Sequence, residues 1–422
     1  MNEPRSPTAA VQPRALVPPA FTRGSVSTPE SGRPRPRFVL YSPLAAFSSF
    51  HARSPWLMFP RAFEELGYAS TIICGSVSDL PTTSRLNVVR TGVVSTSSTA
   101  RRFARAILEP LLAFREIARQ RPDVVMIGPM GPPLASALPL IVLYRRFGRR
   151  ASRTRFVLKT DSNLTDYWLG PLASRLMDLL VVASTHVFDL VTLETYCSLD
   201  RARRLAGSRT EKFARVPLGY PKGAIDVRAY GTSPREPVIL CVARVTPEKG
   251  QDVLLRAFES LAPIFPEWSL RFAGPTVSVD YLAELVKATE APALRGRVAF
   301  LGFVSQERID SEYARAAIFC LPTLRESAGQ VKYEAAASGV PVVTTDVPCA
   351  RDAEELGWLV APAGDARTLG AKLAHLMEAD ARRRDISARA MDRLETYEDL
   401  ARECLRALGL ALPRAPPGNE PS

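Results

Sequence analysis

Residues 238–258 read VILCVARVTPEKGQDVLLRAF, and this stretch decides the fold that we expect for the C-terminal half of the chain. The six apolar residues at its start are typical of a strand that is buried on both faces. Pro247 and Gly250 then interrupt the chain, and the apolar spacing from Gln251 onward predicts a helix. Because strand, turn and helix follow one another directly, the sequence predicts a parallel sheet covered by helices.

The same alternation of strand and helix runs through most of the chain. In the first half, strands are predicted at 38–41, 71–74, 124–128 and 156–159, and helices at 56–66, 100–119 and 134–147. In the second half, strands are predicted at 238–243, 270–273, 298–301, 318–321 and 342–344, and helices at 251–261, 279–290, 307–316 and 330–338. Proline and glycine gather between 217 and 236. We therefore expect an α/β protein with two Rossmann-like, doubly wound domains that face each other across a cleft.

The ends of the chain differ in composition from the predicted domains. Residues 1–37 contain eight prolines and six arginines with few large apolar side chains, and residues 413–422 are similar. Such segments cannot repay the entropy of ordering, so both are predicted to be disordered tails. The first tail is open to two interpretations, an uninvolved extension or an electrostatic tether. The expected order is tail 1–37, N-terminal domain 38–220, linker 221–236, C-terminal domain 237–392, a helix at 393–412 that packs back on the N-terminal domain, and tail 413–422.

Charge is distributed unevenly along the 422 residues, whose formal net charge is +12. Residues 236–410 carry 21 basic and 26 acidic side chains, a net charge of −5, so the remainder carries +17. Residues 38–235 alone carry 27 basic and 14 acidic side chains. We expect the N-terminal half to meet an anionic partner and the C-terminal half not to.

Several classes of protein are disfavoured. The apolar segments 134–144 and 176–193 are short or interrupted by charge, which argues against a membrane-spanning protein, and the N-terminus lacks the apolar core of a secretory signal. The six cysteines lie far apart without a C-x-x-C pair, and the three histidines are scattered. We therefore expect reduced thiols in a cytoplasmic protein, and neither a metal site nor a cofactor.

Two groups of residues in the second half carry the chemistry. Arg244 follows the strand quoted first, and Lys249 precedes the next helix, so both cations would lie beside free backbone N–H groups. That combination suits a phosphate group. Residues 321–346 read LPTLRESAGQVKYEAAASGVPVVTTD, in which Glu326 and Glu334 lie eight residues apart at the start of a predicted helix. Two such carboxylates suit the recognition of vicinal hydroxyls on a sugar or ribose.

Taken together, these features resemble the donor domain of retaining glycosyltransferases with the GT-B fold, of the group 1 (family 4) type. The resemblance extends from residue 238 to about 380 and includes EELGWLVAPAGD at 354–365. Its most specific part is the Glu-x7-Glu spacing of Glu326 and Glu334 combined with the upstream Arg-x4-Lys-Gly. It implies a metal-independent, hexosyltransferase-type enzyme that moves a sugar, with retention, from a UDP- or GDP-sugar to a glycan, polyprenyl-linked or other lipid acceptor.

The resemblance also implies a role for each residue. Arg244 and Lys249 would bind the diphosphate and neutralise the charge that develops on it. Glu326 and the backbone of the next three residues would hold the transferred sugar, and Glu334 would bind the ribose. The remaining donor-binding positions are Ser327, Ala328, Gly329 and Ala243, the last in place of the glycine in the family's usual Gly-Arg step.

The sequence departs from the family pattern in the first half. The usual glycine pair after the first strand is replaced by Ala45-Ala46, within YSPLAAFSSFHARSP at 41–55, and the usual Asn-Gly before the second domain is Leu218-Gly219. Asp161 occupies the position at which many members have a histidine. Asp161 is a candidate acceptor-side residue or a helix cap, and His51 is a second acceptor-side candidate.

The basic N-terminal half leaves several alternatives open. Arginine-rich, amphipathic segments at 101–121 and 145–155 suit an anionic membrane surface, but the whole chain is rich in arginine. The basic runs lack interleaved aromatic residues, so we expect no nucleic-acid partner. The expected location is the cytoplasm, with peripheral contact to the membrane. Two other functions remain open: a non-catalytic nucleotide-sugar-binding subunit, and an epimerase or phosphorylase on the same fold.

Overall fold

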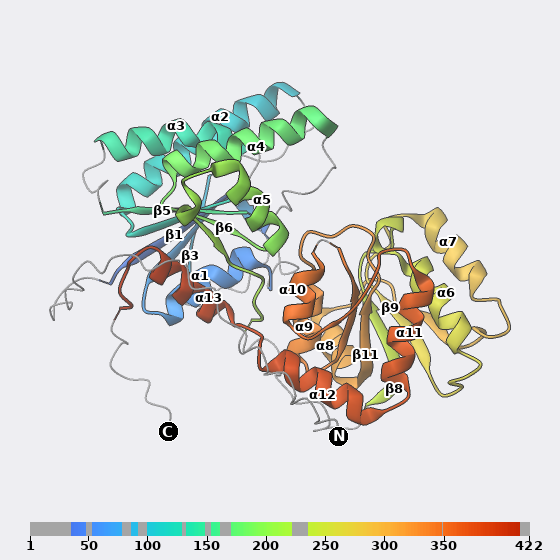
Figure 1. Ribbon diagram of the computed structural model, residues 1–422. Coiled ribbons are helices and arrows are strands. Elements are labelled where there is room, and N and C mark those ends of the chain that lie inside the picture. Colours follow the sequence, from blue (N-terminus) through green and yellow to red (C-terminus); the bar gives the residue numbers. More distant parts are fainter. Residues whose placement is uncertain are drawn as a thin grey trace, which may run out of the picture.

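The computed structural model describes residues 35–47, 53–77, 86–91, 99–128, 132–147, 153–160, 170–221, 235–347 and 349–413. These residues form two parallel sheets, each with helices on both faces (Figure 1). The predicted α/β fold with two doubly wound domains is confirmed. Residues 1–34 and 414–422 of the predicted tails, the middle of the linker, His51 and Asp161 lie outside the described residues. The predicted end of the first tail at residue 37 is wrong, because Arg37 begins β1.

The N-terminal sheet has seven strands in the order β3-β2-β1-β4-β5-β6-β7. Their bounds are β1 Arg37–Phe47, β2 Ala69–Val77, β3 Asn87–Arg90, β4 Val124–Ile127, β5 Arg155–Lys159, β6 Leu190–Leu193 and β7 Phe213–Arg215. One face packs against α2 Thr99–Gln120, α3 Pro132–Phe147, α4 Gly170–Val187 and α5 Tyr196–Ala206. The other face packs against α1 Pro55–Glu65 and α13 Tyr397–Ala407.

The first strand is longer than predicted. It was expected to end at Tyr41, but it continues to Phe47, with Ala46 opposite Ser76 of β2 after an irregularity that follows Ser42. The prediction that Ala45 and Ala46 lie in a loop is therefore wrong, because both residues belong to β1. The irregularity lets the backbone continue to pair although Pro43 cannot donate a hydrogen bond.

The C-terminal sheet has six strands in the order β10-β9-β8-β11-β12-β13. Their bounds are β8 Glu236–Val242, β9 Ser269–Ala273, β10 Val298–Phe300, β11 Ala316–Leu321, β12 Val342–Thr345 and β13 Leu359–Ala361. The first face packs against α6 Gln251–Leu261, α7 Val279–Ala288 and α11 Ala366–Met377. The second packs against α8 Gln306–Arg315, α9 Gln330–Ala337, α10 Ala350–Glu355 and α12 Asp380–Met391.

The last helix crosses from the C-terminal domain back to the N-terminal one (Figure 1). α13 begins with a capping box in which Thr396 and Asp399 bond to each other's backbone N–H. Its Tyr397 ring lies 5.4 Å from the ring of Phe59 in α1, and the following apolar residues complete the core beneath the first sheet. The two domains are thus joined by two chain crossings, one before β8 and one before α13.

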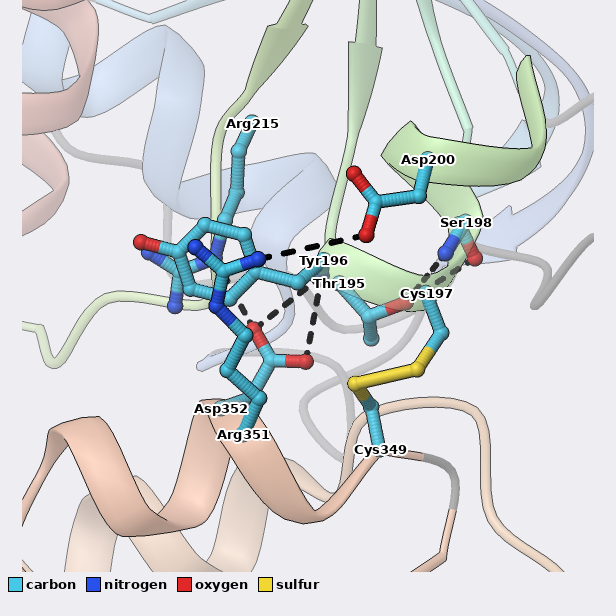
Figure 2. The surroundings of a disulfide bond; sticks show 9 residues. All are labelled: Thr195, Tyr196, Cys197, Ser198, Asp200, Arg215, Cys349, Arg351 and Asp352. Carbon is cyan, nitrogen blue, oxygen red and sulfur yellow. Dashed lines mark hydrogen bonds and ion pairs between the residues drawn. A yellow bond between two sulfur atoms is a disulfide. The ribbon is translucent and has the colours of Figure 1, made fainter. Parts of the chain in front are cut away.

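The expectation that all thiols are reduced is wrong for two of the six cysteines. Cys197 of α5 and Cys349 at the start of α10 form a disulfide across the domain interface (Figure 2). The two residues are 152 positions apart in the sequence, and their spacing follows no known motif. Only the packing of the two domains brings them together.

Candidate functional site

The site lies at the point where the strand order of the C-terminal sheet reverses. β8 and β11 are neighbours there, but their following helices leave toward opposite faces of the sheet. The carboxyl ends of two such strands, with helix N-termini on either side, form the usual ligand site of an open parallel sheet. Arg244 follows β8, and Glu326 follows β11, so both predicted groups lie at this edge.

Lys249 and Glu326 are brought into direct contact. The Lys249 ammonium donates to Oε2 of Glu326 over 2.9 Å, and the two side chains are only 13% and 12% exposed. Oε1 of the same carboxylate accepts from the backbone N–H of Ser327 at 3.1 Å. Glu326 is therefore oriented by a cation on one oxygen and an amide on the other. Removing one partner of a largely desolvated ion pair of this kind is strongly destabilising, because the other partner is left buried without compensation.

The turn that presents Lys249 packs closely on the loop after β11. Gly250 has φ +65°, and a Cβ there would lie 2.2 Å from the carbonyl oxygen of Pro322, so no other residue fits without a backbone shift. The carbonyl of Glu248 also accepts from the N–H groups of Leu324 and Arg325. These contacts fix the position of Lys249 relative to Glu326.

Arg244 differs from Lys249 in its exposure. Its side chain is 56% exposed, and its guanidinium donates to Oε1 of Glu248 over 3.1 Å. Its backbone is fixed, because the Arg244 carbonyl accepts from the buried Gln251 amide at 2.8 Å. An exposed i,i+4 ion pair contributes little to stability, so the guanidinium can turn toward an anionic ligand at low cost.

Residues 326–329, which we name the donor segment, offer backbone groups more than side chains. The Ala328 methyl is buried in the apolar core beneath the segment, and Gly329 begins α9 with φ +80°. The N-terminal amides of α9 follow directly. Anions and hydroxyl oxygens bind readily to such amides.

Glu334 lies deeper than its predicted role suggests. It is 6% exposed, and burial raises the pKa of its carboxyl to about 7, although the charge of Arg53 and a hydrogen bond from the Tyr313 hydroxyl oppose the increase. Arg53 comes from the N-terminal domain and makes two hydrogen bonds, of 2.6 and 2.7 Å, to the carboxylate of Asp310 in α8. Sequence reasoning missed Arg53 and Asp310, because no pattern links two loop and helix residues of different domains.

Two further features at the domain boundary were not predicted from the sequence. Lys159 and Glu194, at the ends of the adjacent strands β5 and β6, form an ion pair of 2.7 Å that is almost fully buried. Gln330 of α9 donates to the carbonyl of Gly219 and accepts from the Tyr397 hydroxyl, so it bonds to both chain crossings. A Cβ at Gly219 would lie 2.9 Å from the Tyr397 backbone nitrogen, which explains the glycine there.

The structure gives no geometry for the acceptor-side candidates. His51 and Asp161 lie outside the described residues, and so do the side chains of Ala45 and Ala46. Among the residues that are described, no group of three or more histidine, cysteine or acidic side chains is arranged to hold a metal ion. No helix in that same part of the chain is long and apolar enough to cross a membrane.

A family model matches the part of the chain that contains this site. Residues 225–393 match the family model described as glycosyl transferases group 1. Over 219 residues the chain is 29% identical to the GDP-mannose-dependent alpha-(1-6)-phosphatidylinositol monomannoside mannosyltransferase of Mycolicibacterium smegmatis. This alignment covers 42% of this chain and 54% of that protein. Over 124 residues the chain is 36% identical to a D-inositol 3-phosphate glycosyltransferase of Rhodococcus jostii. This alignment covers 28% of this chain and 27% of that protein. The chain thus spans about half or less of the curated relatives it matches.

Solved structures match over most of the chain. The sucrose-phosphate synthase of Thermosynechococcus elongatus has a TM-score of 0.66 at 16% identity and covers 88% of this chain and 98% of its own. Anabaena HepE in complex with UDP-glucose has a TM-score of 0.62 at 18% identity, with coverage of 88% and 99%. At such low identity the likeness concerns the fold, and the expected GT-B architecture is confirmed.

Proposed function

We propose that the chain is a group 1 glycosyl transferase, the family whose model matches residues 225–393, and that it transfers a sugar from a nucleotide-diphosphate sugar to an acceptor hydroxyl. The observation that carries the proposal is the contact of Lys249 with Glu326 at the edge between β8 and β11. A cation for phosphate and an acceptor for sugar hydroxyls lie within hydrogen-bond distance there, which is the juxtaposition that a sugar diphosphate requires.

Each residue has a role that its surroundings favour. Arg244, exposed and paired with Glu248, turns to the diphosphate, and Lys249 adds a fixed charge beside it. Both stabilise the negative charge that grows on the leaving group. Glu326 and the amides of the donor segment bind the hydroxyls of the transferred sugar. Glu334 accepts hydrogen bonds from the ribose.

The proposed reaction retains configuration and needs no metal ion. The bond between the sugar C1 and the diphosphate oxygen breaks, and a bond from C1 to the acceptor oxygen forms on the same face. The acceptor proton passes to the leaving diphosphate, which departs as the nucleoside diphosphate. Arg244 and Lys249 supply the positive charge that a divalent cation would otherwise provide.

The acceptor belongs to the N-terminal side of the molecule. α2, α3 and α4 form one layer on the N-terminal domain, away from the C-terminal domain (Figure 1). We name the outer face of this layer the α2–α4 surface. Its large apolar side chains are 48% to 72% exposed, namely Leu108, Leu111, Val142, Leu143, Phe147, Leu176 and Leu179. Exposed arginines lie among them, including Arg115, Arg146 and Arg175.

Apolar side chains interleaved with arginines favour an anionic lipid surface over free solution. The phosphatidylinositol in the name of the Mycolicibacterium relative is a lipid of this kind. We infer that the acceptor is lipid-linked and that the protein works at the cytoplasmic face of a membrane, with the α2–α4 surface against the headgroups.

Nucleotide binding and turnover test the function. UDP, GDP, ADP and their sugar conjugates are screened for an increase in the thermal unfolding midpoint, since a ligand at 100 times its Kd stabilises by about 2.7 kcal/mol. The donor that binds is then incubated with lipid-linked acceptor, and release of nucleoside diphosphate is measured. Binding without release would identify a non-catalytic subunit, and the absence of any shift would refute the proposal.

A further inference from the structure

The disulfide joins the two domains at a place where they already bind each other. Cys197 lies in the first turn of α5, and Cys349 caps α10, with their Cα atoms 5.9 Å apart (Figure 2). α5 belongs to the N-terminal domain and α10 to the C-terminal one. The covalent link therefore adds a third connection between the domains, beside the two chain crossings.

Polar contacts bring the cysteines together independently of the bond. The Asp352 carboxylate accepts from the backbone N–H of Tyr196 at 3.1 Å and from Nε of Arg215 at 2.9 Å. The Tyr196 hydroxyl donates to Glu355 at 2.7 Å. Tyr196 and Arg215 belong to the N-terminal domain, and both acidic residues belong to α10. The residues next to each cysteine are thus fixed across the interface.

Stacking strengthens the same interface. The guanidinium carbons of Arg215 and Arg351 lie 4.2 and 3.8 Å from the centre of the Tyr196 ring, so one arginine from each domain stacks on this tyrosine. Arg351 also approaches Asp200 of α5 at 3.9 Å (Figure 2). These contacts favour the arrangement of the domains in which Cys197 and Cys349 lie at bonding distance.

The other four cysteines are unsuited to redox chemistry. Cys74, Cys241, Cys320 and Cys404 are buried as free thiols. Burial raises the pKa of Cys74, Cys241 and Cys404 to about 12, and it raises the pKa of Cys320 as well. Because the thiolate is the reactive form, these side chains stay inert, whereas Cys197 is only partly buried.

The bond also lies beside the donor segment. Cys349 lines a small cavity together with Thr195 of the N-terminal domain and with Ala328 and Lys332 of the C-terminal domain. Ala328 belongs to the donor segment. A link at Cys349 therefore restrains the N-terminal domain relative to the wall on which the donor segment lies.

We propose that Cys197 and Cys349 are a reversible redox-modification site whose co-reactant is a low-molecular-weight disulfide such as oxidised glutathione. The Cys197 thiolate attacks the co-reactant, forms a mixed disulfide and releases one thiol. The Cys349 thiolate then attacks the Cys197 sulfur, closes the link and releases the second thiol. Two electrons pass to the co-reactant, and the two cysteine protons end on the released thiols.

Oxidation fixes α5 against α10 and restrains the movement of the domains. Donor entry and nucleotide release in a two-domain enzyme depend on such movement. The oxidised protein therefore turns over more slowly than the reduced protein. This effect on turnover rests on the proposed function, but the formation of the link does not.

The link is tested first without any substrate. The full chain is equilibrated in buffers with increasing ratios of oxidised to reduced glutathione, alkylated, and digested without reduction for mass spectrometry. The peptide that joins Cys197 to Cys349 should rise from absent to predominant, while the four buried cysteines remain thiols. Absence of the linked peptide at every ratio, or its persistence in excess reduced glutathione, would overturn a reversible site.

The restraint is tested by unfolding and by turnover. Oxidation should raise the unfolding midpoint of the wild type by on the order of 5 °C. It should also slow nucleotide release several-fold. Cys197→Ser and Cys349→Ser should show neither redox effect. Equal turnover in both redox states of the wild type would overturn the coupling, whereas failure of both states to bind nucleotide would refute the proposed function and leave the link standing.

Discussion

Lys249 donates to Glu326 over 2.9 Å although the two residues are 77 positions apart and belong to different loops. Both side chains are nearly nine-tenths buried, so the pair is part of the stable structure before any ligand arrives. In the proposed function, the donor therefore meets a cation and a carboxylate that are already oriented. The same burial means that a substitution in this pair affects stability as well as activity.

Lys249→Ala should reduce nucleotide release by orders of magnitude and also lower the free energy of unfolding by about 3 kcal/mol, because it leaves the Glu326 carboxylate without its cation. Denaturant unfolding and donor turnover measure the two effects. The double variant Lys249→Met/Glu326→Gln, which removes both charges, should recover most of the stability and none of the activity. Full activity of Lys249→Ala would contradict its role at the diphosphate.

Arg244→Ala should separate the two effects. Its side chain is 56% exposed and forms an i,i+4 ion pair with Glu248, so the free energy of unfolding should change by less than about 0.5 kcal/mol. Turnover should fall by about 10²–10³-fold, since the charge on the leaving diphosphate loses a partner. Arg256→Ala, which breaks a similar exposed pair with Asp252 in α6, serves as the control and should keep full turnover. Loss of turnover in both variants would show that Arg244 has no specific role.

The buried carboxyl of Glu334 should make stability depend on pH. Its pKa is about 7 in the folded protein and near 4.5 when unfolded, so the folded protein binds this proton more tightly. The stabilisation is present below pH 4.5 and is lost as pH rises to about 7, by up to about 3 kcal/mol. Unfolding of the wild type and Glu334→Gln at pH 5 and pH 7.5 measures it, and the variant should gain relative stability at the higher pH.

Glu395 serves as a matched comparison for this prediction. Burial raises the pKa of Glu395 to about 7 as well, and Glu395 lies directly before the Thr396 N-cap of α13, outside the donor segment in the sequence. Glu395→Gln should also reduce the pH dependence of stability, but it should leave donor affinity unchanged, whereas Glu334→Gln should weaken it. A wild type and a Glu334→Gln variant with the same pH dependence would contradict the burial argument.

The sequence was sufficient to predict nine of the thirteen strands in the described part of the chain, because most of those nine are buried on both faces, whereas β3, β6, β7 and β13 were not predicted. β11, with the sequence AAIFCL, is buried at every position, and such runs are visible without any structure. The meeting of Lys249 with the donor segment followed from the same pattern, since residues after neighbouring parallel strands lie at one edge. Lys159 and Glu194 obey this rule too, but β6 is not among the predicted strands, so the sequence did not predict their contact.

Contacts between the domains could not be predicted. Arg53 and Asp310 are separated by 257 positions, and Cys197 and Cys349 by 152. Their approach depends on the angle at which two complete domains pack. That angle is set by the sum of many contacts, including those of α13, and no local periodicity or spacing encodes it.

The ion pair of Arg53 and Asp310 should contribute to the packing of the domains. A double-mutant cycle with Arg53→Ala and Asp310→Ala, followed by denaturant unfolding, should give a coupling free energy of about 1–3 kcal/mol, because the contact is bidentate and Arg53 is only 8% exposed. The exposed pair of Arg256 and Asp252 should give about 0.3–0.5 kcal/mol in the same cycle. Equal coupling free energies for the two pairs would mean that the contact of Arg53 with Asp310 stabilises the protein no more than an exposed ion pair does.

The α2–α4 surface should bind anionic membranes through both charge and apolar contact. The full chain should float with vesicles that contain anionic phospholipid and remain unbound with neutral ones, and raising the salt concentration should weaken flotation because the Debye length falls to about 3 Å at 1 M. Leu143→Glu and Phe147→Glu replace side chains that are 56% and 72% exposed on α3, and both should reduce flotation strongly. Ile264→Glu changes a side chain that is 68% exposed on the C-terminal domain and should leave flotation unchanged. Equal losses in all three variants would show that added negative charge alone causes the effect. Flotation of Phe147→Glu at the wild-type level would show that the α2–α4 surface does not bind the membrane.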